Sequence, residues 1–209
     1  MIDLWYTISM ESVTTLKAVF GILASIFVFF GFLPYLRDIK RKRAKPHILS
    51  WTGWGFVTGL GAVAMYSEGF TWGVTLVGAN SILCFAIAAF AAMTKVGVWQ
   101  RTIFDYLFFI LGFVGIALWQ TFSNPDLAII FAILADLSFG IPTLTKIYRN
   151  PKSETIFPWV MAGLSGLSGV LAVSYISFTE VAYPIYIFLF DSSTLFLIVY
   201  FRKIMKTDL

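Results

Sequence analysis

The sequence predicts an all-α membrane protein with seven transmembrane helices, arranged as two parallel three-helix repeats joined by a linker helix. Three observations predict this fold. The composition is strongly apolar, seven apolar segments alternate with short polar loops, and the second half of the chain repeats part of the first at a spacing of 108 residues.

The composition places the chain in a membrane. Of the 209 residues, 59% are hydrophobic and 12% are charged, with a mean hydropathy of +0.85, and a soluble core cannot bury so much apolar surface. A single cysteine, Cys84, and a single histidine, His47, exclude a disulfide framework and a thiolate or imidazole metal cluster. No metal and no cofactor are therefore expected. The net charge of +4 does not indicate a nucleic-acid partner, because the cations cluster at the ends of apolar segments.

Seven segments are long and apolar enough to cross about 30 Å of hydrocarbon as helices. The loops between them are short and carry helix-breaking residues, as in Asn150-Pro151. The opening of the chain carries acids where a cleavable signal would carry bases, so we expect the first span to act as its own insertion signal. The expected spans are residues 13–36, 48–66, 71–94, 102–121, 126–148, 156–178 and 183–201.

Positive charges lie on alternate loops. Fourteen of the fifteen lysines and arginines fall in the first, third and fifth loops or in the C-terminal tail. The opposite side carries acids: Asp3, Glu11, Glu68, Asp126 and Glu180. By the positive-inside rule, the N-terminus is expected outside the cell membrane and the C-terminus in the cytoplasm.

An internal repeat divides the chain. A shift of 108 residues aligns Pro34 with Pro142 and Trp51 with Trp159, and it gives nine identities in the 31 positions from Pro34 to Ala64. Apolar composition alone would give roughly three. The copies are four spans apart, so they cross the membrane in the same direction. The expected units are residues 1–98 for the first repeat, 99–124 for the linker helix and 125–209 for the second repeat.

The repeated proline falls near the cytoplasmic end of the first helix in each copy. Proline lacks an N–H and clashes with the carbonyl four residues back, so Pro34 and Pro142 are predicted hinges. Gly31 and Gly140 beside them reduce the steric resistance to bending. A static kink is the alternative for either proline alone. Recurrence at matching positions favours a pair of gates.

These features resemble the PQ-loop and SWEET transporter superfamily, over nearly the whole chain as architecture. The Pro-Gln pair of that family is replaced here by Pro34-Tyr35 and Pro142-Thr143. The resemblance implies a transporter that moves a small polar solute, a sugar or an amino acid or amine, by alternating access. A receptor that retrieves escaped endoplasmic-reticulum proteins shares the fold, so a receptor that binds a ligand without transporting it is the alternative.

The resemblance also points to a solute site. With three extra residues in the later loop, the repeat aligns Asn80 with Asp191 and Ser81 with Ser192. In SWEET transporters, a pair of asparagines on the third and seventh helices faces the solute, and these positions correspond to Asn80 and Asp191. Ser192 adds a hydroxyl suited to a polar solute. Trp54 is a candidate stacking wall for a substrate ring, although an interfacial aromatic belt is the default role for such a tryptophan.

Asp136 and Asp191 are the two acids near the middle of a predicted span. An ionised carboxylate there costs several kcal/mol, so such residues usually face a cavity and serve a pathway or a proton relay. Both are therefore predicted to couple solute movement to protons. The structural alternative is a protonated or hydrogen-bonded acid that bridges helices, for example from Asp191 to Asn80 or to the hydroxyl of Ser192 or Ser193.

Two further readings of seven spans fit the sequence poorly. A retinal protein needs a lysine in the middle of the last span, and residues 183–201 contain none. An enzyme needs a nucleophile beside a base, and no histidine lies in any span, so no catalytic residue is expected. The expected partners are the lipid bilayer, a small-molecule substrate and protons. The sequence leaves the oligomeric state open, a homo-oligomer included.

Overall fold

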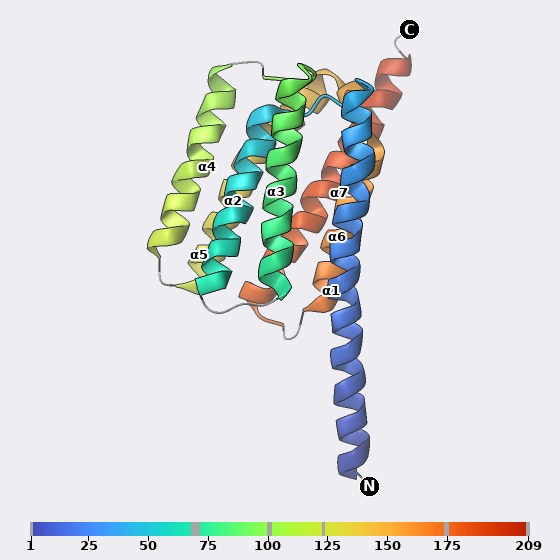
Figure 1. Cartoon of the computed structure of the whole chain (residues 1–209), viewed down its shortest axis with the longest axis vertical. Coiled ribbons are helices and arrows are strands. Elements are labelled where there is room, and N and C mark those ends of the chain that lie inside the picture. Colours follow the sequence, from blue (N-terminus) through green and yellow to red (C-terminus); the bar gives the residue numbers. More distant parts are fainter. Residues whose placement is uncertain (1, 68–71, 100–101, 123, 174–175, 208–209) are drawn as a thin grey trace.

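The computed structural model describes the chain except for residues 1, 68–71, 100–101, 123, 174–175 and 208–209. The described residues form one bundle of seven α-helices (Figure 1). In chain order these are α1 (Ile2–Lys40), α2 (Ile48–Ser67), α3 (Trp72–Met93), α4 (Ile103–Thr121), α5 (Pro125–Arg149), the short 3-10 helix η1 (Pro151–Ser153), α6 (Ile156–Ala172) and α7 (Phe178–Thr207). Within the described ranges there is no β-strand, and His47 and Val98 form an isolated bridge.

The helices are apolar enough for a bilayer. Four of them contain segments long and apolar enough to cross a membrane, and α2, α3 and α6 contribute shorter apolar helices. Large apolar side chains also cover the outside of the bundle: Leu33 and Ile82 are each 69% exposed, and Ile103 is 80% exposed. Such a surface is typical of lipid contact rather than of water. The all-α architecture and the membrane character are consistent with the sequence prediction. The four long segments are Thr15–Lys40, Ile103–Thr121, Asp126–Arg149 and Val181–Ile204.

The helix ends differ from the predicted spans in three places. Helix α1 begins at Ile2 rather than at residue 13, and its first part extends beyond the other helices (Figure 1). Helix α6 ends at Ala172 rather than at residue 178, and α7 begins at Phe178 rather than at residue 183. Hydropathy marks only the part of a helix that suits hydrocarbon, so a polar extension such as the start of α1 is not detected by it.

The predicted hinge prolines lie inside continuous helices. Helix α1 runs through Pro34 to Lys40, and α5 runs through Pro142 to Arg149. Helix α1 therefore ends about one turn after residue 36, the expected end of the first span. A helix can continue past a proline because only one backbone hydrogen bond is lost, and neighbouring groups can compensate in a packed bundle.

Helix pairing follows a simple pattern. Helix α1 packs against α6 and touches α3, α2 packs against α3 and α5, and α7 packs against α6 and α5. Helix α4 lies against α5 and touches α2. The central apolar cluster includes Trp54, Phe139, Trp159 and Phe190, and a smaller cluster around Tyr35 lies between α1 and α3.

Close approach between helices depends on glycine at a few positions. A Cβ atom on Gly53 or on Gly112 would overlap the ring of Phe139, so both glycines make room for that buried side chain. A Cβ atom on Gly166 would lie 2.8 Å from Cα of Phe188, which brings α6 into backbone contact with α7. The small residues of α2 and α6 thus allow tight helix packing.

The cation-rich loops gather at one end of the bundle. The amide of Lys45 donates to the carbonyl of Ser153 at 2.7 Å, and the amide of Ile48 donates to the carbonyl of Val98 at 3.0 Å. The loops after α1, α3 and α5 are therefore in contact with one another. The C-terminal end of α7 lies at the same end, and the N-terminus lies at the opposite end (Figure 1).

Candidate functional site

Asp136 is held in the middle of the bundle by two tyrosines. Its carboxylate accepts hydrogen bonds from the hydroxyl groups of Tyr186 at 2.7 Å and Tyr183 at 3.1 Å. The indole N–H of Trp54 donates to the backbone carbonyl of Asp136 at 3.1 Å. Asp136 is only 5% exposed. Hydroxyl donors on both carboxyl oxygens fix the orientation of this side chain.

Asp191 is equally buried but lacks such support. It is 7% exposed, and no hydrogen bond joins its side chain to any described residue. Some buried polar atoms lack a partner and are also fully enclosed, but the carboxyl oxygens of Asp191 are not among them. These oxygens therefore lie at the small part of the residue that stays accessible. Asp191 interacts electrostatically with Asp136. The alternative role, a bridge from Asp191 to Asn80, Ser192 or Ser193, is therefore not formed in this structure.

Neither Ser192 nor Asn80 uses its side chain in a hydrogen bond with a described residue. Ser192 is on α7, and its hydroxyl oxygen would be 3.5 Å from a Cβ on Gly163 of α6. Asn80 is half-buried on α3, and its side chain has no hydrogen bond to a described residue. Both side chains are thus available to a ligand.

Trp54 belongs to an aromatic wall rather than to an exposed belt. It is 8% exposed, and its ring lies edge-on to Trp159 at 6.4 Å and to Phe190 at 6.0 Å between centroids. The ring of Tyr186 lies 5.8 Å from that of Phe190. The wall therefore continues to the tyrosines that hold Asp136. The indole N–H of Trp159 is enclosed and has no partner among the described residues.

Two cavities lie away from these acids. One of about 240 Å³ lies between α4 and α5, next to the predicted hinge Pro142, and its polar lining includes Asp105 and Arg149. The other, of about 360 Å³, lies at the start of α7 and is mainly apolar. Neither is lined by Asn80 or Asp191.

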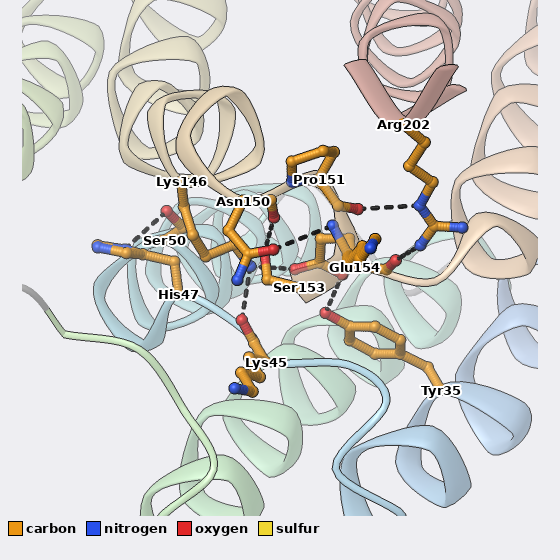
Figure 2. A network of polar contacts seen from close by, with 11 residues as sticks. Tyr35, Lys45, His47, Ser50, Lys146, Asn150, Pro151, Ser153, Glu154 and Arg202 are labelled. Atoms are coloured by element: carbon orange, nitrogen blue, oxygen red, sulfur yellow. Dashed lines mark hydrogen bonds and ion pairs between the residues drawn. The ribbon is translucent and has the colours of Figure 1, made fainter. Parts of the chain in front are cut away.

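A buried polar network ties the cation-rich end together (Figure 2). Glu154 is fully buried and forms an ion pair with Lys146, and it accepts a hydrogen bond from the hydroxyl of Tyr35 at 2.8 Å. Lys146 also donates to the carbonyl of Lys45 at 2.6 Å. The guanidinium of Arg202 donates to the carbonyl of Pro151 at 3.0 Å and to that of Glu154. The network joins α1, α5 and α7 to the loop between α1 and α2 and to the connection between α5 and α6.

His47 and Asp105 form a second buried contact at this end. Nε2 of His47 lies 3.6 Å from a carboxyl oxygen of Asp105, and His47 is 1% exposed. Asp105 also completes a capping box with Thr102 at the start of α4. Burial lowers the pKa of His47 to about 4, because desolvation outweighs the opposing attraction of Asp105. The imidazole is therefore neutral near pH 7.

The sequence identified some members of this site and missed others. It indicated Asp136, Asp191 and Trp54, and the structure brings these three into one neighbourhood through electrostatic and hydrogen-bond contacts. It missed Tyr183 and Tyr186, although their spacing of three places both hydroxyls on one face of α7. It also assigned Lys146 to membrane orientation alone, whereas this lysine is buried in an ion pair with Glu154.

The described residues contain no group of three or more His, Cys, Asp or Glu side chains that could hold a metal ion. The site is therefore built from carboxyl, hydroxyl, amide and aromatic groups. Comparison with protein-family models, with curated proteins and with solved structures finds no match for the chain.

Proposed function

We propose that the protein is a membrane transporter that moves a small polar solute by alternating access, with coupling to protons. The observation that carries this proposal is the pair of buried acids, Asp136 and Asp191, in the interior of an apolar helix bundle. Removing two carboxyl groups from water is costly for a membrane protein, and such acids usually serve a pathway. The side chains of Asp191 and Asn80 have no hydrogen bond to a described residue. The ring of Trp54 lies against that of Phe190, the residue before Asp191 on α7.

Helix packing supports two like-oriented repeats joined by α4. Under the repeat, α1 corresponds to α5, and α2 corresponds to α6. The contact between α1 and α6 then has the contact between α5 and α2 as its counterpart, and both occur. The pairs α2 with α3 and α6 with α7 are counterparts in the same way. Transporters with parallel repeats bind their solute between the halves.

Individual residues support the same symmetry. Lys45 and Ser153 are 108 positions apart and touch through a backbone hydrogen bond. A residue that contacts its own repeat counterpart must lie close to the axis that relates the two copies. In addition, the hydroxyl of Ser81 donates to the carbonyl of Gly55 at 2.7 Å, and the corresponding Ser192 lies against Gly163.

The cation-rich end is proposed to be the cytoplasmic gate, which is closed in this conformation. The hydrogen bonds from Tyr35 to Glu154 and from Lys146 to Lys45 cross between the proposed halves, so opening requires them to break. Pro34 and Pro142 are the proposed hinges. The cavity beside Pro142 leaves room for α5 to bend. This orientation keeps the N-terminus outside the cell membrane and the C-terminus in the cytoplasm.

Uptake into liposomes tests the proposal. The purified full-length chain is reconstituted, and uptake of a panel of radiolabelled sugars, amino acids and vitamins is measured with and without a pH gradient. We expect saturable uptake of one solute class, faster with the gradient. Asp191→Asn should reduce uptake at least about tenfold, because a charged hydrogen-bond partner is lost.

Asp126→Asn is the matched control, because Asp126 is an exposed acid at the first turn of α5. It should leave uptake unchanged. Saturable binding of a solute without any flux would contradict transport and favour a receptor of the same fold. A pH dependence that survives in Asp191→Asn would remove Asp191 from proton coupling.

A further inference from the structure

The centre of the bundle has two acids and no balancing cation. The electrostatic partners of Asp136 and Asp191 among the described residues are acids, hydroxyl groups and aromatic side chains, with no lysine or arginine. Lys146 is ten residues beyond Asp136 in α5, about 15 Å along the helix axis, and it is already paired with Glu154. A negative charge on Asp191 therefore needs a cation that the described residues do not supply.

The two acids divide the roles. Tyr183 and Tyr186 donate hydrogen bonds to both oxygens of Asp136 and stabilise its charge. Asp191 receives no such bond from the described residues, so its charge has no compensation. An ionised carboxylate without a partner is unfavourable in an apolar interior. Asp191 must therefore hold either a proton or an external cation.

An aromatic cluster includes Phe190, the residue that precedes Asp191 on α7. The ring of Trp54 lies edge-on to the rings of Trp159 and Phe190, and all three side chains are buried. Faces of tryptophan attract organic cations, and an aromatic wall next to a carboxylate is the usual recognition site of an alkylated ammonium group. A metal ion would instead need several oxygen ligands in a closed shell.

We propose that the solute of this site is a small organic amine, whose ammonium group binds the carboxylate of Asp191 while its alkyl part packs against Trp54 and Trp159. The inference rests on the proposed transport function and names its substrate class. Binding of the ammonium displaces the proton from the carboxyl group of Asp191, so one positive charge replaces another. Transport of the amine in one direction then accompanies transport of one proton in the other.

Asp191 is the group that exchanges its proton for the ammonium. The titratable groups that face it are those of α5, α7 and α3, and α6 contributes none in its described span. η1 carries Lys152, which is exposed at the cation-rich end. The facing groups are Asp136, Tyr183, Tyr186 and, through Tyr183, Cys84.

A pair of probes that differ in charge but hardly in shape tests this inference. tert-Butylammonium and tert-butanol are titrated against the full-length chain in nanodiscs, and binding is followed by thermal stabilisation at about pH 8 and about pH 6. We expect tert-butylammonium to bind and tert-butanol not to bind. Binding should weaken at the lower pH. Asp191→Asn should lower the affinity at least about tenfold, whereas the control Asp126→Asn should not.

Asp191→Glu keeps the charge and guards against a folding defect, and we expect it to retain part of the binding. Equal stabilisation by both probes, equal loss in Asp126→Asn and Asp191→Asn, or full competition by sodium ions would overturn the inference. Uptake separates it from the proposed function. Binding of tert-butylammonium without flux would contradict the proposed transport and leave the amine site standing. Flux of a neutral sugar without ammonium binding would contradict the amine as solute and leave transport standing.

Discussion

Asp136 and Asp191 have similar burial but different surroundings, and this difference determines what each side chain can do. Asp136 accepts two tyrosine hydroxyl bonds and is fixed in place. Asp191 has no described hydrogen-bond partner and can exchange a proton or a ligand. Under the proposed function, we therefore expect Asp191 to contact the solute and Asp136 to act mainly by holding a fixed position next to it.

Replacing Tyr186 tests the fixed role of Asp136. Tyr186→Phe removes the hydroxyl that lies 2.7 Å from the carboxylate. We expect the free energy of unfolding to fall by about 1.5 to 3 kcal/mol, the usual range for a hydrogen bond to a charged group. Tyr200→Phe is the control, because Tyr200 is 48% exposed and stacks on Phe196 without a hydroxyl partner among the described residues. Equal thermal stability of the two variants in detergent would contradict this role.

His47 is expected to make the folded protein less stable as the pH falls. Burial lowers its pKa from 6.5 to about 4. Between these values the unfolded chain binds more protons than the folded chain, so stability rises with pH. The contribution is fully present above about pH 6.5 and is lost as the pH falls through 4. Between about pH 7 and about pH 5, we expect a loss of about 2 kcal/mol.

The measurement compares thermal unfolding of the wild type and of His47→Gln at the two pH values. The variant lacks the titrating group and should lose less stability on acidification. If the two proteins lose the same stability, His47 is not the source of the effect.

The sequence did not reveal Tyr183, Tyr186 and Glu154 for one common reason. Asp136 and Asp191 stand out because a charge inside an apolar segment is costly and therefore conspicuous. Tyr183 and Tyr186 are ordinary residues for a membrane helix, and their role depends on how α5 is positioned against α7. Glu154 was missed for the same reason, since its partners Tyr35 and Arg202 are distant in the chain.

At the scale of helices, hydropathy predicts the existence and order of all seven, and it fails at their ends. The start of α1 and the boundary between α6 and α7 depend on residues that do not differ clearly between helix and loop. The spacing of glycines in α2 and α6 predicts close packing, but it does not identify the helix that approaches. The structure identifies α3 for Gly59 and α7 for Gly166.

Gly166 allows a direct test of helix contact. In Gly166→Ala the new Cβ would lie 2.8 Å from Cα of Phe188, and a backbone atom cannot move away cheaply. Alanine favours a helix over glycine by about 1 kcal/mol, but we expect overpacking of about 1 to 3 kcal/mol to exceed this gain. Gly61→Ala is the matched control, because the nearest atom there is 3.7 Å away on Trp119.

The control should be neutral or slightly stabilising, since only the helix preference changes. Thermal unfolding of both variants in the same detergent gives the comparison. A Gly166→Ala protein as stable as Gly61→Ala would mean that α6 and α7 are not in backbone contact.

At the scale of the whole molecule, polar contacts at the cation-rich end connect the two proposed repeats. Hydrogen bonds from Tyr35 and Lys146 and the backbone pair of Lys45 with Ser153 connect the halves across the proposed axis. The sequence repeat predicts that two such units exist. It does not predict these links, because Tyr35 and Lys146 have no chemically similar counterpart at the matching positions Thr143 and Asp38.

Cys84 is the single cysteine of the sequence and is 5% exposed near Asp136, so it can report whether the centre opens. Tyr35→Phe removes the hydroxyl bond to Glu154 and with it one link that opening must break. If this bond contributes about 1 to 2 kcal/mol, the open population should rise about five- to thirtyfold. A membrane-impermeant maleimide applied to oriented vesicles should then label Cys84 faster, and only from the cation-rich side. Tyr148→Phe at the same end is the control, because Tyr148 is 66% exposed and contacts Phe201 through its ring. Faster labelling from the N-terminal side would contradict a closed gate at the cation-rich end of the bundle.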